Sequence, residues 1–131
     1  MIATSITLEM ISNLSLVPLE DLAKAYKGED WGSTDDLYDF QAELAWSETF
    51  VSQTLNVPWD NVTNQSDFIN AIIWKMLSKV YRNCSSGIGD HYYIKHRDAE
   101  DNYKLEMATA RATTYDNQTT KAETGWNWMM S

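Results

Sequence analysis

The stretch "SDFINAIIWKMLSKVYRN", residues 66–83, decides the fold of this chain. Its apolar residues come as adjacent pairs four positions apart, so they form two neighbouring stripes over about half of a helix circumference. A helix of this kind needs neighbours on both flanks. We therefore predict that it is the central helix and that its apolar side chains build the core. These core residues are Phe68, Ile69, Ile72, Ile73, Met76, Leu77 and Val80.

A second long helix is predicted by "DDLYDFQAELAWSETFVSQTLNV", residues 35–57. Apolar residues recur along it at steps of three and four, which places them on one face. Trp46 and Phe50 form a further pair to one side of that face. The core residues predicted on this helix are Leu37, Phe40 and Leu44.

The remaining segments predict shorter or more polar elements. One or two short helices come before Gly28, and "RDAEDNYKLEMATARATT" (97–114) predicts a charged helix. Glycines interrupt the pattern near 86–96, where we expect either a short β-hairpin or an extended loop. The predicted fold class is all-α, a small bundle of about four to five helices with an extended C-terminal tail. Residues 1–115 form the helical domain and 116–131 the tail.

Length and charge restrict the possible functions. The chain has 131 residues, enough for one domain with a real core, and its net charge is −9. Residues 20–60 hold ten carboxylates against two lysines, which argues against nucleic-acid binding by this half. Cys84 is the single cysteine, so an intramolecular disulfide is impossible. No secretory leader or membrane-spanning run is recognisable, and we expect a soluble intracellular protein without a membrane partner.

Two groups of side chains invite a chemical interpretation. Acidic residues at the start of the second helix could bind a divalent cation, but a solvated helix start favoured by the dipole is the preferred interpretation. His91 and His96 could ligate zinc or act in acid–base catalysis. Their spacing of five suits neither a helix nor a strand, which favours exposed loop histidines. The acidic residues are Asp35, Asp36, Asp39 and Glu43.

Reactive motifs are not found. Cys84 follows an apolar helix and has only Arg82 nearby as a positive charge, so a thiol at a helix end is favoured over a nucleophile. The chain also carries no phosphate-binding loop or paired-carboxylate motif. We predict no enzymatic activity, no metal site and no cofactor.

The tail ends in "TGWNWMMS", in which four large apolar residues follow no helical period. Trp and Met are favoured as anchors in the pockets of partner proteins. We predict that the tail docks into another protein, and the alternative is that it folds back on its own core. The four residues are Trp126, Trp128, Met129 and Met130.

The order of these elements resembles the head–tail connector, or adaptor, proteins of tailed phages. The likeness covers about residues 5–115: a short N-terminal helix, a helix that begins with acids and ends in "FVSQTLNVPWD", a loop, the apolar "FINAIIWKMLSKVYRN", and a charged helix. "WKMLSKVYRN" stands where family members have a hydrophobic run followed by Tyr, Glu or Arg, and Asn. The loop at 84–96 and the aromatic tail match no motif of the family.

The resemblance implies a structural virion protein in the phage neck, assembled in the host cytoplasm. Such subunits form a ring, usually twelvefold, between the portal protein and a stopper or tail-completion protein. Double-stranded DNA passes through the ring without specific binding. The C-terminal segment often reaches the portal, which would give Trp126 and Trp128 a role.

Physical arguments extend these expectations. A helix that is apolar over half its circumference offers more surface than a small bundle needs, so neighbouring subunits could cover the excess, with Trp46 and Phe50 at the contact. An acidic channel repels DNA, so Asp35, Asp36, Asp39 and Glu43 are candidates for the channel face. The competing hypothesis is a small helical regulator that binds one partner through its tail.

Overall fold

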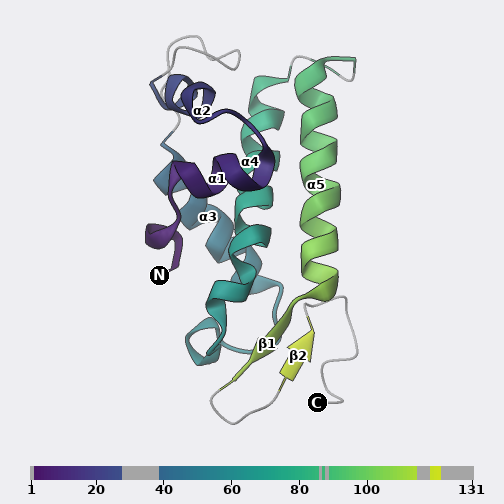
Figure 1. Cartoon of the computed structure of the whole chain (residues 1–131). Coiled ribbons are helices and arrows are strands. Elements are labelled where there is room, and N and C mark those ends of the chain that lie inside the picture. The colour runs from purple at the N-terminus through teal and green to yellow at the C-terminus, as the bar shows by residue number, and fades with distance from the viewer. Residues whose placement is uncertain (1, 28–38, 86, 88, 115–118, 122–131) are drawn as a thin grey trace.

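The computed structural model of the chain describes residues 2–27, 39–85, 87, 89–114 and 119–121. Within them the fold is all-α, as the sequence predicts, with one short antiparallel ribbon added at an end. In Figure 1, α4 and α5 lie side by side and run in opposite directions, while α1 crosses in front of α4. The α-helices are α1 (Leu8–Ser15), α2 (Leu19–Tyr26), α3 (Phe40–Gln53), α4 (Ile69–Cys84) and α5 (His91–Thr109).

The central position of α4 is confirmed. It packs against α5 along its length and also contacts α1, α3 and the short 3-10 helix η1 (Ile2–Ser5). Ile69 is half-buried against the core, and Leu37 lies outside the described residues. Every other predicted core residue is buried: Phe40, Leu44, Phe68, Ile72, Ile73, Met76, Leu77 and Val80.

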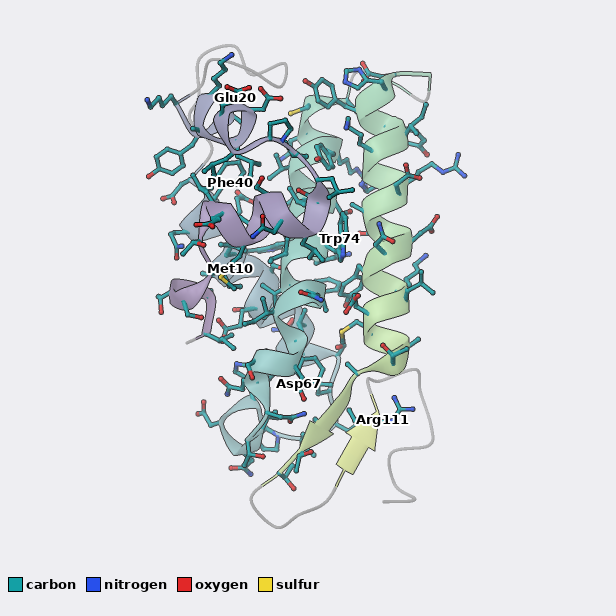
Figure 2. All side chains as sticks on the ribbon, viewed as in Figure 1. Met10, Glu20, Phe40, Asp67, Trp74 and Arg111 are labelled. Carbon is teal, nitrogen blue, oxygen red and sulfur yellow. The ribbon has the colours of Figure 1, made fainter. Side chains whose placement is uncertain are left out.

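This packing corrects one expectation from the sequence. The apolar stripes of α4 were predicted to exceed what one bundle can cover, yet α1, α3, α5 and η1 of the same chain bury them. The reason is that α1 crosses in front of α4 (Figure 1 and Figure 2) and η1 also contacts it, so these two short elements cover surface that α3 and α5 leave open. The width of the apolar face therefore creates no need for a second subunit.

A buried carboxylate fixes the N-terminal segment against α3. Glu48 is only 2% exposed, and its oxygens accept hydrogen bonds from the backbone N–H of Ala3 at 2.7 Å and of Ile2 at 3.2 Å. Trp59 in the 3-10 helix η2 (Trp59–Asn61) donates its indole N–H to the same group at 2.7 Å. Because a buried carboxylate needs such donors, Glu48 has a structural explanation.

The segment near 86–96 is the second correction. Its described residues, 87 and 89–96, contain no strand, because α5 already begins at His91, where the Asp90 side chain accepts a hydrogen bond from the Tyr92 N–H at 2.7 Å. The Tyr92 ring stacks on Tyr81 of α4, with 6.5 Å between centroids. Packing of this first turn on α4 outweighs the strand preference of its tyrosines.

The third correction concerns the end of the predicted charged helix. It ends at Thr109, and Arg111–Thr113 form strand β1, which pairs antiparallel with β2 (Thr119–Lys121), inside the segment assigned to the tail. Asn64 fastens β1 from the other side: its amide donates to the Arg111 carbonyl at 2.6 Å, and its oxygen accepts from the Thr113 N–H at 2.7 Å. Contacts distant in sequence thus set this ribbon.

Candidate functional site

Several predicted functional residues lie outside the described part of the chain. These are the acidic residues Asp35 and Asp36 and the tail residues Trp126, Trp128, Met129 and Met130. Their roles stay predictions.

The two described acidic candidates both have partners within the chain. Asp39 caps α3, since its carboxylate accepts a hydrogen bond from the Ala42 N–H at 3.1 Å. Glu43, one turn later and half-buried, pairs with Lys79 of α4, with 3.0 Å between carboxylate oxygen and ammonium nitrogen. Asp39 therefore stabilises the start of α3, while the buried Oε2 of Glu43 has the Lys79 charge beside it but accepts no hydrogen bond from the described residues.

The predicted contact residues Trp46 and Phe50 lie together on α3, with 5.7 Å between ring centroids. Lysines of α4 lie over both rings: Lys79 Nζ is 4.4 Å from the Trp46 centroid, and Lys75 Nζ is 4.2 Å from that of Phe50. Phe50 also meets Tyr103 of α5 edge-on. Trp46 remains 38% exposed, so of the two it is the ring with more surface left for a partner.

Beside these rings lies a cluster of four polar side chains, here called the polar cluster: Lys75, Ser78, His96 and Glu100. Helices α4 and α5 bring them together. The Glu100 carboxylate is 2.8 Å from Lys75 Nζ and accepts a hydrogen bond from the Ser78 hydroxyl at 2.6 Å. His96 Nδ1 lies 3.0 Å from that hydroxyl and 2.9 Å from the Ser78 carbonyl oxygen.

The protons of the polar cluster show what it can do. The Ser78 hydroxyl has one hydrogen and donates it in the hydrogen bond to Glu100. The contact between His96 Nδ1 and the Ser78 carbonyl oxygen therefore requires a hydrogen on Nδ1, which donates to that carbonyl. A nucleophilic serine would instead give its proton to the histidine and reach solvent, but Ser78 is only 2% exposed. The arrangement is a closed network that joins two helices.

Burial alone would raise the pKa of Glu100. Hydrogen bonds from Lys75 and Ser78, with the positive charge of Lys75, outweigh burial and hold the pKa of this carboxyl below its usual range. Glu100 also acts on Tyr103, since burial and then the Glu100 charge raise the pKa of that phenol to about 12 against a hydrogen bond with Thr54. The carboxylate is therefore the ionised centre of this surface.

The prediction that His91 and His96 are loop residues is wrong, because both lie on α5. His96 is half-buried against Ser78, whereas His91 stacks on Tyr92 at the start of α5, with 4.1 Å between centroids. Five residues along a helix turn two side chains to different faces. Neither lies in a loop, and no group of three potential metal ligands occurs in the described segments. Cys84, as predicted, ends α4.

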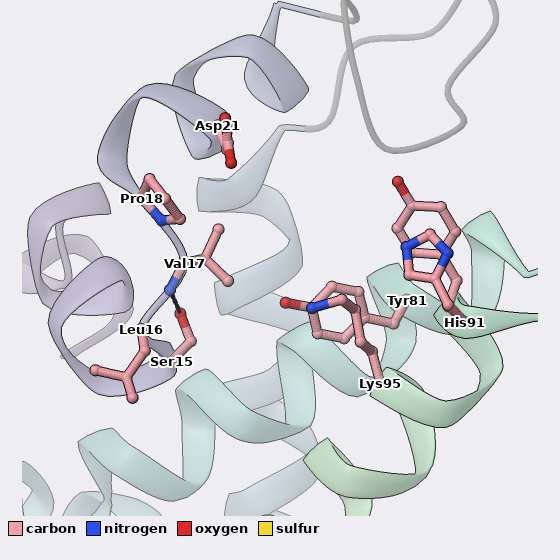
Figure 3. A pocket seen from close by; sticks show the side chains of 9 residues that line it. Ser15, Leu16, Val17, Pro18, Asp21, Tyr81, His91 and Lys95 are labelled. Atoms are coloured by element: carbon pink, nitrogen blue, oxygen red, sulfur yellow. Dashed lines mark hydrogen bonds between the residues drawn. The ribbon is translucent and has the colours of Figure 1, made fainter.

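A cleft of about 290 Å³ opens where the α1–α2 connection approaches α4 and α5. In Figure 3 Val17 and Pro18 stand on one side, with Asp21 beyond them, and Tyr81, His91 and Lys95 on the other. We call this the corner cleft. Its lining is Ser15, Leu16, Val17, Pro18, Asp21, Tyr81, His91, Tyr92 and Lys95.

Opposite charges occupy the two walls of the corner cleft without meeting. Asp21 on α2 and Lys95 on α5 form no ion pair with each other, and neither pairs with another described residue. Lys95 Nζ lies 5.6 Å from the centroid of the Tyr81 ring. Burial, then Tyr92 and Cys84, raise the pKa of the Tyr81 hydroxyl to about 12. The cleft therefore offers a carboxylate and an ammonium group to solvent.

No family model, curated protein or solved structure matches this chain. Within the described segments, no helix combines the length and the apolar character that crossing a bilayer requires.

Proposed function

We propose that this chain is a structural protein of a tailed phage, a head–tail connector that forms a ring beneath the portal and lines the path of the DNA. The observation that carries the proposal is the order and packing of the helices. An acid-capped α3, an apolar α4 at the centre and a charged α5 follow one another as the likeness to connectors implies. The side chains of the polar cluster bind one another and join α4 to α5, and this arrangement also fits a structural role.

Exposed apolar side chains give further support. A ring subunit contacts several neighbours, so it needs anchors on more than one element. Large apolar side chains stand in solvent on the α1–α2 connection and on α2, α3 and α5. They are Leu16, Leu19, Tyr26, Trp46, Ile94 and Leu105.

The decisive experiment mixes the purified chain with the portal protein encoded in the same genome. We expect rings of the chain on one end of the portal by electron microscopy. A chain lacking residues 126–131 should fold but no longer attach, while Lys104→Ala, at an exposed position of α5, should attach normally. A monomer that ignores the portal and binds one unrelated protein would refute the proposal and favour the regulator.

The channel hypothesis needs variants that spare the fold. Asp39 caps α3, and asparagine caps as well as aspartate, so Asp39→Asn removes charge at little structural cost. The variant that combines it with Asp35→Asn and Asp36→Asn should assemble normally and slow DNA ejection. Ejection at the normal rate from fully assembled particles would exclude these acids from the channel.

A further inference from the structure

Leu16 adopts a backbone conformation that leucine rarely takes. It ends α1 with φ 61° and ψ 19°, in the left-handed region, and is alone among the described non-glycine residues in having a positive φ. At the end of a helix this position usually holds glycine or asparagine, because a Cβ atom is unfavourable there. The choice of leucine at this position needs a reason.

Packing within the chain does not supply that reason. The Leu16 N–H donates to the Ser12 carbonyl at 2.9 Å, and the Ser12 hydroxyl donates to the Val17 carbonyl at 2.6 Å, so hydrogen bonds hold the turn. The side chain itself is 87% exposed, and Figure 3 shows it on the rim of the corner cleft, pointing away from Tyr81 and Lys95. A glycine would make the same turn with less strain.

The surroundings of Leu16 combine a protruding apolar group, a hollow and both signs of charge. Behind it lies the corner cleft, with Val17 and Pro18 on one wall and tyrosine rings on the other. Asp21 stands on the α2 wall, and Lys95 on the α5 wall, with no ion pair between them. A surface that carries both a protrusion and a cleft, and both charges, can be complementary to itself.

We propose that this corner is a two-fold contact between two copies of the chain. Leu16 of each copy enters the corner cleft of the other, and Asp21 of each faces Lys95 of the other. A second copy fits better than an unrelated acidic segment, because the latter would satisfy Lys95 but leave Asp21 facing a like charge. The pair does not depend on the connector function, since a chain with another role would form it through the same side chains.

The first test measures self-association by sedimentation over a range of concentrations. We expect the wild-type chain to form dimers and Leu16→Gly to weaken them at least about tenfold, since each copy loses a leucine side chain that the dimer contact would bury. Leu105→Ala, which removes another exposed leucine, should dimerise as the wild type does. A chain that stays monomeric to about 1 mM, or a glycine variant that dimerises normally, would overturn the proposal.

A charge exchange between copies gives the second test. Asp21→Lys alone and Lys95→Glu alone should each weaken dimerisation, because each places like charges opposite one another. A mixture of the two variants should form a heterodimer of wild-type strength, since both contacts then join opposite charges, one as the wild-type pair and the other with its two charges exchanged. Lys104→Glu, on exposed α5 surface, is the matched control and should change nothing. Circular dichroism shows that each variant remains folded.

The outcomes separate this contact from the connector proposal. If the mixture associates no better than the single variants while self-association persists in all of them, copies meet elsewhere and this surface is refuted, although ring formation stands. If the portal binds no ring but the dimer behaves as expected, the connector function fails and the contact remains.

Discussion

The polar cluster and the corner cleft use the same kinds of side chain in opposite ways. In the polar cluster, Lys75 is 2.8 Å from Glu100, and its ammonium group also lies over the rings of Phe50 and Tyr103. In the corner cleft, Lys95 is one of the exposed cations and has no ion pair within the described segments. Lys75 lies on α4 and Lys95 on α5, and both positions are helical. The side chains around each lysine, not its backbone, therefore determine whether it forms an ion pair.

The difference shows which charges serve the fold. A partly buried charge without a partner is costly, so the members of the polar cluster stabilise the α4–α5 contact only as a set. An exposed lysine adds little to stability, so Lys95 is available for a contact outside the chain. The closed network therefore belongs to the structural part of this molecule, whereas the unpaired charges beside an exposed leucine lie where we propose that a second copy binds.

Replacing each lysine by methionine tests this difference directly. Lys75→Met should lower the free energy of unfolding by about 2 kcal/mol, because Glu100 loses its cation in a partly buried site. Lys95→Met should change it by less than about 0.5 kcal/mol. Urea denaturation at neutral pH measures both. Equal effects would mean that the two lysines do not differ in structural role.

The pH dependence of stability sharpens the role of Glu100. Its pKa is lower in the folded chain than in the unfolded chain, so its contribution is complete above the unfolded pKa and is lost as pH falls through the folded value. Glu100→Gln should therefore lose stability relative to the wild type at pH 7, and the gap should close in acid. The same series in Asp101→Asn, an exposed neighbour, should show no such gap. A gap that is independent of pH would contradict the assignment.

Much of the fold follows from the sequence because its signals are local. The paired spacing of Ile72, Ile73, Met76 and Leu77 predicts a buried helix, and all four are buried. The segment from His91 was predicted wrongly because strand preference is weak against packing on a neighbouring helix. The ribbon of β1 and β2 depends on Asn64, whose contact crosses 47 residues, and no local pattern could show it.

Less of the candidate site could be predicted. The sequence places Lys75 and Lys79 towards the far end of an apolar helix, but their positions over Phe50 and Trp46 depend on how α3 packs beside α4. His96 was considered only together with His91, although its partner is Ser78 on another helix. Leu16 gave no signal, because a glycine or asparagine at that position would have indicated the turn and a leucine does not.

The phenol of Tyr81 tests how closed the inner wall of the corner cleft is. Its pKa is raised to about 12, so the hydroxyl stays neutral in the folded chain at a pH where the unfolded chain has lost the proton. Stability from this group is present below about pH 10 and is lost as pH rises towards 12. Absorbance titration should show two late phenols, Tyr81 and Tyr103, and Tyr81→Phe should remove one of them. An unchanged titration curve would mean that this wall is open to water.

The smallest expected change in the free energy of unfolding is that of Leu16→Gly. Its sign decides whether the corner cleft differs from the polar cluster in role. Leu16→Gly relieves a left-handed backbone but gives the unfolded chain more freedom, so we expect unfolding to become harder by only about 0.5 kcal/mol. Measured at concentrations where the chain is monomeric, this gain separates the fold from the contact. Val17→Gly, next in the chain and partly buried against the core, is the control and should destabilise. A loss of stability in Leu16→Gly would show that the leucine serves its own chain, and the corner would then belong with the polar cluster as structure.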